Sequence, residues 1–127
     1  MDAKIKLSLI NNRGEGFMGI GLVWLLKNID ECRSISGAAR SMKLSYVKAL
    51  RIVNRLEKNL GRKVVNRTRG GDSRGGTELT PFGRRFLEAY ERYQAEVDRA
   101  ARAGFQRFLG SGWDREDRAA PGLRSED

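Results

Sequence analysis

Histidine is absent from this sequence of 127 residues, and cysteine occurs once, at Cys32. Zinc sites are built mainly from His and Cys ligands, and the common hydrolytic triads need a histidine base. Because no other pairing of a nucleophile with a base is visible, we expect neither an enzyme nor a bound metal or cofactor. A lone cysteine also excludes an internal disulfide and indicates a reducing compartment, with Cys32 filling space near a helix end.

Long hydrophobic runs are equally scarce. The longest, residues 17–26, has ten residues including two glycines, which is too short to cross a bilayer. It has no small-residue cleavage site, and Lys27, Asp30 and Glu31 follow it, so it does not fit a secretory signal. We therefore expect a cytoplasmic protein with no membrane contact. The run predicts a buried first helix at about residues 20–32, whose core side carries Leu22, Leu25, Leu26 and Ile29.

Acidic residues are few in the first two thirds of the chain. Residues 1–60 contain 11 Lys and Arg against 5 Asp and Glu, and residues 61–87 contain 7 against 2, which gives net charges of +6 and +5. The whole chain carries +9, so its remainder is slightly acidic. A polyanion is the expected partner, because a cationic surface gains affinity by releasing the counterions condensed on phosphates.

The stretch from residue 34 to residue 61 reads as two helices joined by a short break. Ser34 or Ser36 supplies an N-cap for the first helix, which has a small apolar face at Ala38, Ala39 and Met42. After Lys43 and Leu44, Ser45 offers a second N-cap. The second helix repeats apolar residues at helical spacing, at Tyr46, Ala49, Leu50, Val53, Leu56 and Leu60.

Four cations lie on the opposite face of the second helix: Lys48, Arg51, Arg55 and Lys58, here called the basic stripe. Gly61 then ends the helix. A solvated surface is the ordinary reading of such a stripe, but only one acid, Glu57, is near enough to compensate it. A buried side and a polar side on the second of two short helices are what a DNA-reading helix-turn-helix requires.

Strands are expected around this motif. Residues 4–9 alternate polar and apolar, which predicts a strand with Ile5, Leu7 and Leu9 inward, pairing with strands at residues 64–65 and 78–80. Between those two strands, residues 67–77 form a glycine-rich hairpin tip, or wing, with Arg67, Arg69 and Arg74 facing a phosphate backbone. The wing is not a nucleotide-binding loop, because no lysine follows its last glycine.

A long last helix is predicted from Pro81 to about residue 108, capped by Thr80. Its apolar seam of Phe86, Tyr90, Tyr93, Val97, Ala100, Gly104 and Phe108 suits a partner helix, so we expect a homodimer. Residues 110–127 read as a flexible tail in which Trp113 either tucks against a helix or has no role. The expected fold is mainly α with a small antiparallel sheet: a winged helix-turn-helix domain over residues 1–109, including a dimerisation helix at about 81–108.

These residues resemble a known group of proteins. The strings Ser34-Ile-Ser-Gly-Ala-Ala-Arg, Leu44-Ser-Tyr-Val-Lys-Ala, Asn66-Arg-Thr-Arg-Gly-Gly and Leu79-Thr-Pro-Phe-Gly-Arg-Arg are similar to the DNA-binding domain of ModE-type molybdate-responsive bacterial regulators. A more distant resemblance is to the winged helix-turn-helix of LysR-type regulators. The resemblance covers about residues 4–109. It implies a homodimer that binds an operator, with the first strand joined to the wing sheet.

The resemblance also implies the DNA contacts: Ser34, Ser36, Ser45, Tyr46, Lys48, Arg51, Arg55 and the wing residues Arg67, Arg69 and Arg74. Leu50 replaces a tryptophan that is common in the family, and the wing has fewer glycines, so operator preference should differ. We expect this protein to lack the molybdate-sensing domains that follow in family members. Oxyanion sensing is therefore not carried over, and no small-molecule ligand is evident.

We expect a sequence-specific transcriptional regulator, a dimeric repressor associated with double-stranded DNA in the nucleoid. Three modes of regulation remain open: the protein represses constitutively, responds to a partner protein, or binds a ligand at the dimer interface. The alternative is a winged-helix adaptor that binds proteins and has no operator of its own. An adaptor should carry apolar or mixed charges, rather than four cations, on the exposed face of the second helix.

Overall fold

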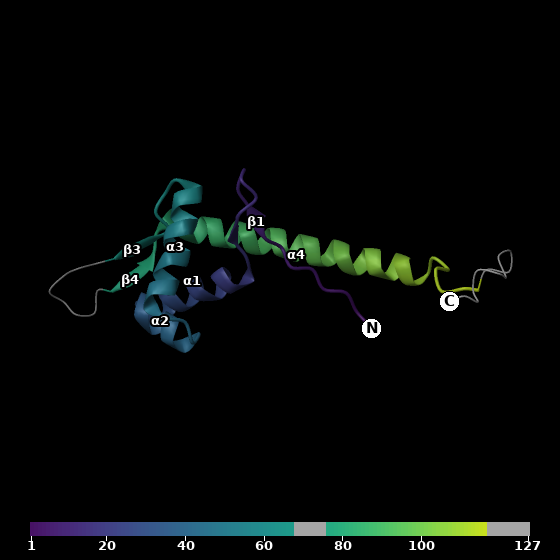
Figure 1. Ribbon diagram of the computed structural model, residues 1–127, viewed down its shortest axis with the longest axis horizontal. Helices are drawn as coiled ribbons and strands as arrows, with labels where there is room; N and C mark the ends of the chain where they lie inside the picture. Colours follow the sequence, from purple (N-terminus) through teal and green to yellow (C-terminus); the bar gives the residue numbers. More distant parts are fainter. Residues whose placement is uncertain (68–75, 117–127) are drawn as a thin grey trace. The chain divides into compact units, whose positions relative to one another are not determined.

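The computed structural model describes residues 1–67 and 76–116 (Figure 1). Residues Lys6–Ala95 form one compact unit, and the remaining residues at the two ends of the chain form a second. In chain order the elements are β1 Leu9–Ile10, β2 Gly16–Met18, α1 Ile20–Cys32, α2 Ile35–Ser41, α3 Tyr46–Leu60, β3 Val65–Arg67, β4 Thr77–Leu79 and α4 Pro81–Leu109. The mainly helical prediction with small antiparallel sheets is confirmed.

The core of the first unit is built where α1, α2 and α3 meet. Leu26, Ile29, Val53 and Leu56 are completely buried there. The predicted bounds of the first helix are confirmed, and so are its four core residues. The expectation for Cys32 was wrong, because this residue at the end of α1 is exposed.

Local capping sets the boundaries of the two middle helices. The hydroxyl oxygen of Ser34 accepts the N–H of Gly37 at 2.9 Å, so Ser34 rather than Ser36 is the cap of α2. The hydroxyl oxygen of Ser45 accepts the N–H of Lys48 at 3.0 Å and caps α3. Gly61, with a φ of 72°, ends α3 in the left-handed conformation that glycine adopts without cost. The two predicted helices, the N-cap of the second and its end at Gly61 are therefore confirmed.

The wing strands pair with each other as expected, but their bounds differ: Val64 and Thr80 lie outside them, whereas Arg67 and Thr77, predicted for the tip, lie within them. β3 and β4 are antiparallel, with Val65 opposite Leu79 and Arg67 opposite Thr77. The base of the hairpin is hydrogen-bonded to the end of α1. The N–H of Thr77 donates to the carbonyl of Arg33, the C-cap of that helix, at 2.9 Å.

The predicted first strand was wrong in extent and in partner. Only Leu9 and Ile10 form a strand, and it pairs with β2 in a sheet of its own rather than with the wing. Ile5 is 44% exposed, and Leu7 is half-buried. The reason is local: Asn11 organises a tight turn, and a hairpin closed over a few residues loses less chain entropy than a pairing with residues near 64 or 79.

The start of α4 packs on the first unit. The hydroxyl oxygen of Thr80 accepts the N–H of Gly83 at 2.8 Å, which confirms Thr80 as the cap. Leu87 and Tyr90 are buried, and the hydroxyl of Tyr90 donates to the carbonyl oxygen of Leu7 at 2.8 Å. The helix ends at Leu109, one residue beyond the predicted end.

The second unit contains the end of α4 and the turns that follow it. Trp113 stacks on Phe108 with the ring centroids 5.2 Å apart, and Phe105 lies 6.1 Å from Phe108. Trp113 thus contacts the end of α4, the helix that directly precedes it, and is 57% exposed. Residues 117–127 of the predicted tail lie outside the part of the chain that the structure describes.

Asp30 of α1 joins α1 to the wing and to α4. Its carboxylate accepts the N–H of Leu79 at 3.1 Å and two N–H groups of Arg84 at 2.6 and 3.0 Å. Burial by itself would raise the pKa of Asp30. The hydrogen bonds from Arg84 and Leu79, together with the charges of Arg84 and Arg33, outweigh burial and hold this pKa below its ordinary value.

We predict an acid-sensitive contribution to stability from Asp30. A lowered pKa in the folded state means that the stabilisation is complete above the unfolded-state pKa of about 3.9 and is lost as the pH falls below it. Asp30→Asn should cost about 1 to 2 kcal/mol at pH 7 and less at pH 3. Urea unfolding at the two pH values measures this, with Glu31→Gln as the control for removing one carboxyl from the same helix. Equal losses at both values would contradict the prediction.

Candidate nucleic-acid interface

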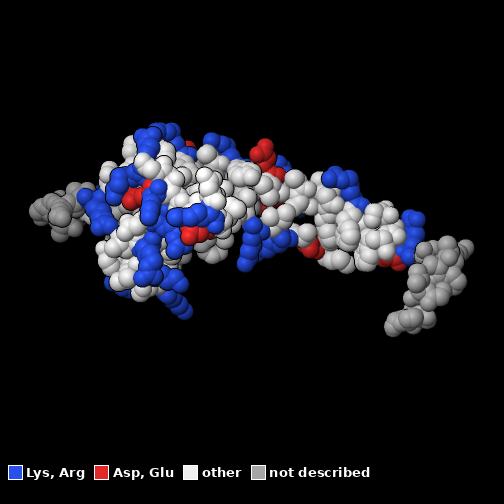
Figure 2. Space-filling model, turned by 45° about the horizontal axis from the view of Figure 1, so that its top comes forward, with Lys and Arg blue, Asp and Glu red and all other residues white. Residues whose placement is uncertain are grey.

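The basic stripe lies along the solvent side of α3. Lys48, Arg51, Arg55 and Lys58 are all exposed, while Ala49, Val53 and Leu56 on the other side are completely buried. Lysine and arginine atoms form a band over the part of the molecule that contains α2 and α3, with few acidic atoms beside it (Figure 2). The helix therefore presents its cations outward and its apolar residues to the core.

Glu57, the one acid of α3, points away from the stripe. Its Oε2 accepts the N–H groups of Val64 and Val65 at 2.9 and 3.2 Å, and its Oε1 lies 3.2 Å from Nζ of Lys63. The side chain is 10% exposed. Within residues 1–67 and 76–116, no carboxylate lies within 4.0 Å of a stripe cation. The stripe is thus not neutralised by the protein's own acids there.

The first turns of α2 and α3 bring hydroxyl groups to the surface. Ser36 and Ser45 are exposed, Ser34 is half-buried, and the Oγ atoms of Ser34 and Ser36 are 3.1 Å apart. The Ser45 oxygen accepts a cap bond, which leaves its O–H as a donor to an outside group. Tyr46 is 45% exposed, so its assignment to the apolar stripe of α3 was wrong: it lies in the first turn, where the core does not reach.

The wing is described only in part. Arg67 is exposed at the end of β3. Arg69 and Arg74 lie in residues 68–75, outside the described ranges.

The β1–β2 hairpin was missed as a neighbour of the stripe. Together with α3 it forms an open groove of ≈870 Å³, whose lining includes Arg51, Arg55 and Lys58 from the stripe and Asn12, Arg13 and Glu15 from the hairpin. The hydrogen bond from Asn11 and the charge of Arg13 lower the pKa of Glu15, and the charges of Arg55 and Lys58 act in the same direction. The turn signal Asn-Asn-Arg-Gly at residues 11–14 could have identified this hairpin.

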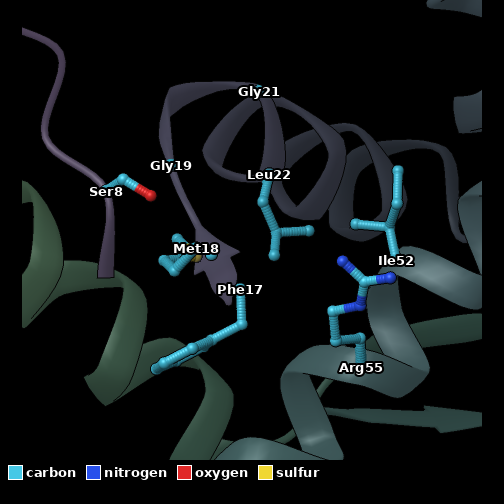
Figure 3. A pocket seen from close by; sticks show the side chains of 9 residues that line it. Ser8, Phe17, Met18, Gly19, Gly21, Leu22, Ile52 and Arg55 are labelled. Carbon is cyan, nitrogen blue, oxygen red and sulfur yellow. The ribbon is translucent and has the colours of Figure 1, made fainter. Parts of the chain in front are cut away.

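A smaller hollow of ≈350 Å³ lies between β2, the start of α1 and α3. Phe17, Leu22 and Ile52 give it apolar walls, and the guanidinium of Arg55 extends toward Leu22 and Ile52 (Figure 3). Arg55 therefore borders both hollows, whereas Arg51 lines only the larger groove.

No helix in the described part of the chain is long and apolar enough to cross a membrane. The same residues contain no group of three or more His, Cys, Asp or Glu side chains that could hold a metal ion.

The sequence is similar to molybdenum-related proteins of bacteria. It is 39% identical over 69 residues to the transcriptional regulator ModE of Haemophilus influenzae, a match that covers 54% of this chain and 27% of that protein. It is 35% identical over 96 residues to the molybdenum-pterin-binding protein MopB of Rhodobacter capsulatus, with coverage of 76% and 36%. The chain thus spans well under half the length of either relative.

A solved structure has a similar fold. The DNA-binding domain of CbnR, in a complex with DNA, matches 74% of this chain and 99% of its own chain with a TM-score of 0.53 and 24% identity. At that identity the match establishes the winged-helix fold. Residues 22–84 match the family described as bacterial regulatory helix-turn-helix protein, lysR family. Over residues 22–84, the helix-turn-helix of this chain is therefore similar to that of the LysR family.

Proposed function

We propose that this chain is a sequence-specific DNA-binding transcriptional regulator related to the molybdate-responsive regulators. The observation that carries the proposal is the exposed basic stripe on the second helix of a helix-turn-helix, which forms no ion pair with a carboxylate among residues 1–67 and 76–116. In this arrangement α3 enters the major groove, and its cations contact base edges and phosphates.

The proposed contacts divide by chemistry. Arg51 and Arg55 carry planar guanidinium groups that suit guanine edges, and Lys48 suits a phosphate. Ser34, Ser36, Ser45 and Tyr46 lie at helix starts, where hydroxyl donors and backbone N–H groups suit phosphates. Arg67, Arg69 and Arg74 would contact the backbone from the wing. This set defines the proposed DNA-binding domain within residues 1–109.

The proposed role in DNA binding also implies where the protein works and how it acts. The chain would work beside the chromosome in the cytoplasm, as a repressor and not as an enzyme. The name of one relative, MopB, describes it as molybdenum-pterin-binding. We do not propose molybdenum binding for this chain, because the match covers only 36% of that relative. The adaptor alternative predicted an apolar or mixed surface on α3, and four exposed cations do not favour it.

Selection of binding sites from random duplex DNA by the purified protein tests this function. We expect one enriched motif with dyad symmetry and half-sites about one helical turn apart. A variant with Lys48, Arg51 and Arg55 changed to alanine should enrich no motif while it stays folded by circular dichroism. Failure of the wild-type protein to enrich any sequence would overturn the proposal.

We also propose that α4 pairs with its copy in a second chain. Tyr93 and Phe108 are 46% and 49% exposed, and Val97 lies four residues after Tyr93 and three before Ala100 in the same seam. Apolar side chains at this spacing are buried when two helices pair. Sedimentation at micromolar concentration should therefore return the mass of two chains.

A matched pair of variants localises the dimer contact. Ala100→Lys places a charge on the seam and should weaken dimerisation by about tenfold or more, because a charge is costly to bury without a partner. Ala95→Lys makes the same change on the opposite face of the helix and should leave the dimer intact. A wild-type monomer, or equal behaviour of the two variants, would rule out this seam.

A further inference from the structure

The tip of the β1–β2 hairpin, residues 11–15, is held in one conformation by its own hydrogen bonds. The side-chain oxygen of Asn11 accepts the N–H groups of Arg13 at 2.9 Å and Glu15 at 3.0 Å. Its backbone N–H and carbonyl bond to Glu15 and Gly14, both at 2.9 Å, and Gly14 takes a φ of 80°. A tip built in this way presents Asn12 and Arg13 in a defined direction.

The tip is also attached to α3. Nδ2 of Asn11 donates to Oδ1 of Asn59 at 3.1 Å, and Asn59 in turn donates to the carbonyl of Arg55 at 2.9 Å. The contact joins residues 48 positions apart in the chain. It sets the distance between the hairpin tip and the C-terminal half of the basic stripe.

The groove between tip and helix has the chemistry of a phosphate-binding surface. Four cations line it, Arg13, Arg51, Arg55 and Lys58, against one acid, Glu15. Asn12, Asn54 and Asn59 add amide donors. At ≈870 Å³ and open to solvent, the groove suits an extended polyanion rather than a small apolar ligand.

Arg13 is available for such a partner. Its contact with Glu15 is 3.6 Å long, and the two side chains are 75% and 57% exposed. Exposed pairs of this kind contribute little to stability, since water screens them. A phosphate can therefore replace the Glu15 carboxylate as the partner of Arg13 at little cost to the stability of the fold.

We infer that the β1–β2 hairpin is a second DNA-contacting arm, in addition to the wing. Arg13, supported by Asn12, contacts a backbone phosphate that flanks the bases facing α3, and the Asn11–Asn59 contact positions the arm. The inference rests on the proposed DNA-binding function. The arm contacts DNA from the side of α3 on which the hairpin lies. Because the Glu15 carboxylate and a DNA phosphate are both negatively charged, Glu15 lowers the affinity for DNA.

The test is Arg13→Ala, assayed by titration of the selected operator and of an unrelated duplex at several salt concentrations. We expect affinity to fall about 3- to 10-fold on both duplexes, and the slope of log affinity against log salt to become shallower by about 0.9. Arg85→Ala removes one charge from an exposed α4 position outside the groove, and it should leave the slope unchanged.

Glu15→Gln is the second variant, because an amide oxygen preserves the acceptor for Asn11 while the negative charge is removed. It should bind both duplexes about 2- to 5-fold more tightly at low salt. If the wild-type protein binds DNA but Arg13→Ala keeps its affinity and slope, the hairpin arm is overturned and the proposed function stands. If the wild-type protein binds no DNA, the proposed function itself fails. Thermal melts identical to wild type establish that a changed slope is not a folding defect.

Discussion

Glu57→Ala is expected to lower the free energy of unfolding by about 2 to 4 kcal/mol, the largest stability effect that we predict for a surface-accessible residue. The Glu57 carboxylate accepts the N–H groups of Val64 and Val65, and both of these residues are buried. Alanine would leave these two buried donors without their acceptor. Chemical denaturation followed by circular dichroism measures the loss.

The consequence for the wing is specific. Val64 precedes β3 and Val65 begins it, so loss of their acceptor should raise amide hydrogen exchange at residues 64 and 65 before it affects the middle of α1. Glu57→Gln keeps one oxygen acceptor and should recover part of the loss. Lys58→Ala, an exposed neighbour on α3, should change stability by no more than about 0.5 kcal/mol. A Glu57→Ala variant as stable as Lys58→Ala would show that the two bonds contribute nothing.

For DNA recognition, Arg51→Ala should have the largest effect of any stripe variant. We expect a loss of about 1 to 3 kcal/mol of discrimination at one base position, or roughly 5- to 150-fold. Arg51 is exposed in the second turn of α3, has no ion pair within the described ranges, and lines only the open groove. Competition titrations against operators changed at single positions measure the discrimination.

The control for charge is Arg51→Lys. It keeps the positive charge but loses the planar pair of donors that binds a guanine edge, so it should bind DNA in general while it discriminates poorly at that position. If Arg51→Ala weakens binding equally on every sequence, Arg51 contacts a phosphate and another residue reads the base.

Much of the fold was predictable because its signals are local. Ser45 caps α3 and Gly61 ends it through bonds to residues a few positions away, and Thr80 with Pro81 starts α4 in the same way. Such signals are visible in a short window of sequence. The cationic side of α3 follows from helical spacing alone, because a helix that buries Ala49 and Val53 must expose the residues opposite them.

The wrong predictions concern residues whose sequence pattern is compatible with more than one local structure. Residues 4–9 have the alternation of a strand, yet only Leu9 of that run is in one, because alternation does not say which partner a strand will find. Asn11 and Gly14 allow a partner only a few residues away. Tyr46 fits the apolar spacing of α3 but lies in its first turn, where no other element covers it.

The amino-acid sequence by itself determined the helices, their caps and the basic face of α3, because each depends on residues within a turn or two of one another. Only the tertiary structure decided which charged side chains pair within the protein and which remain available to a partner. Asp30 meets Arg84 across 54 residues, and Glu57 turns toward the start of the wing, so neither carboxylate opposes the stripe. The fold likewise brings Arg13 beside Arg51 and Arg55. Such contacts depend on how distant segments pack, and no spacing within one segment encodes them.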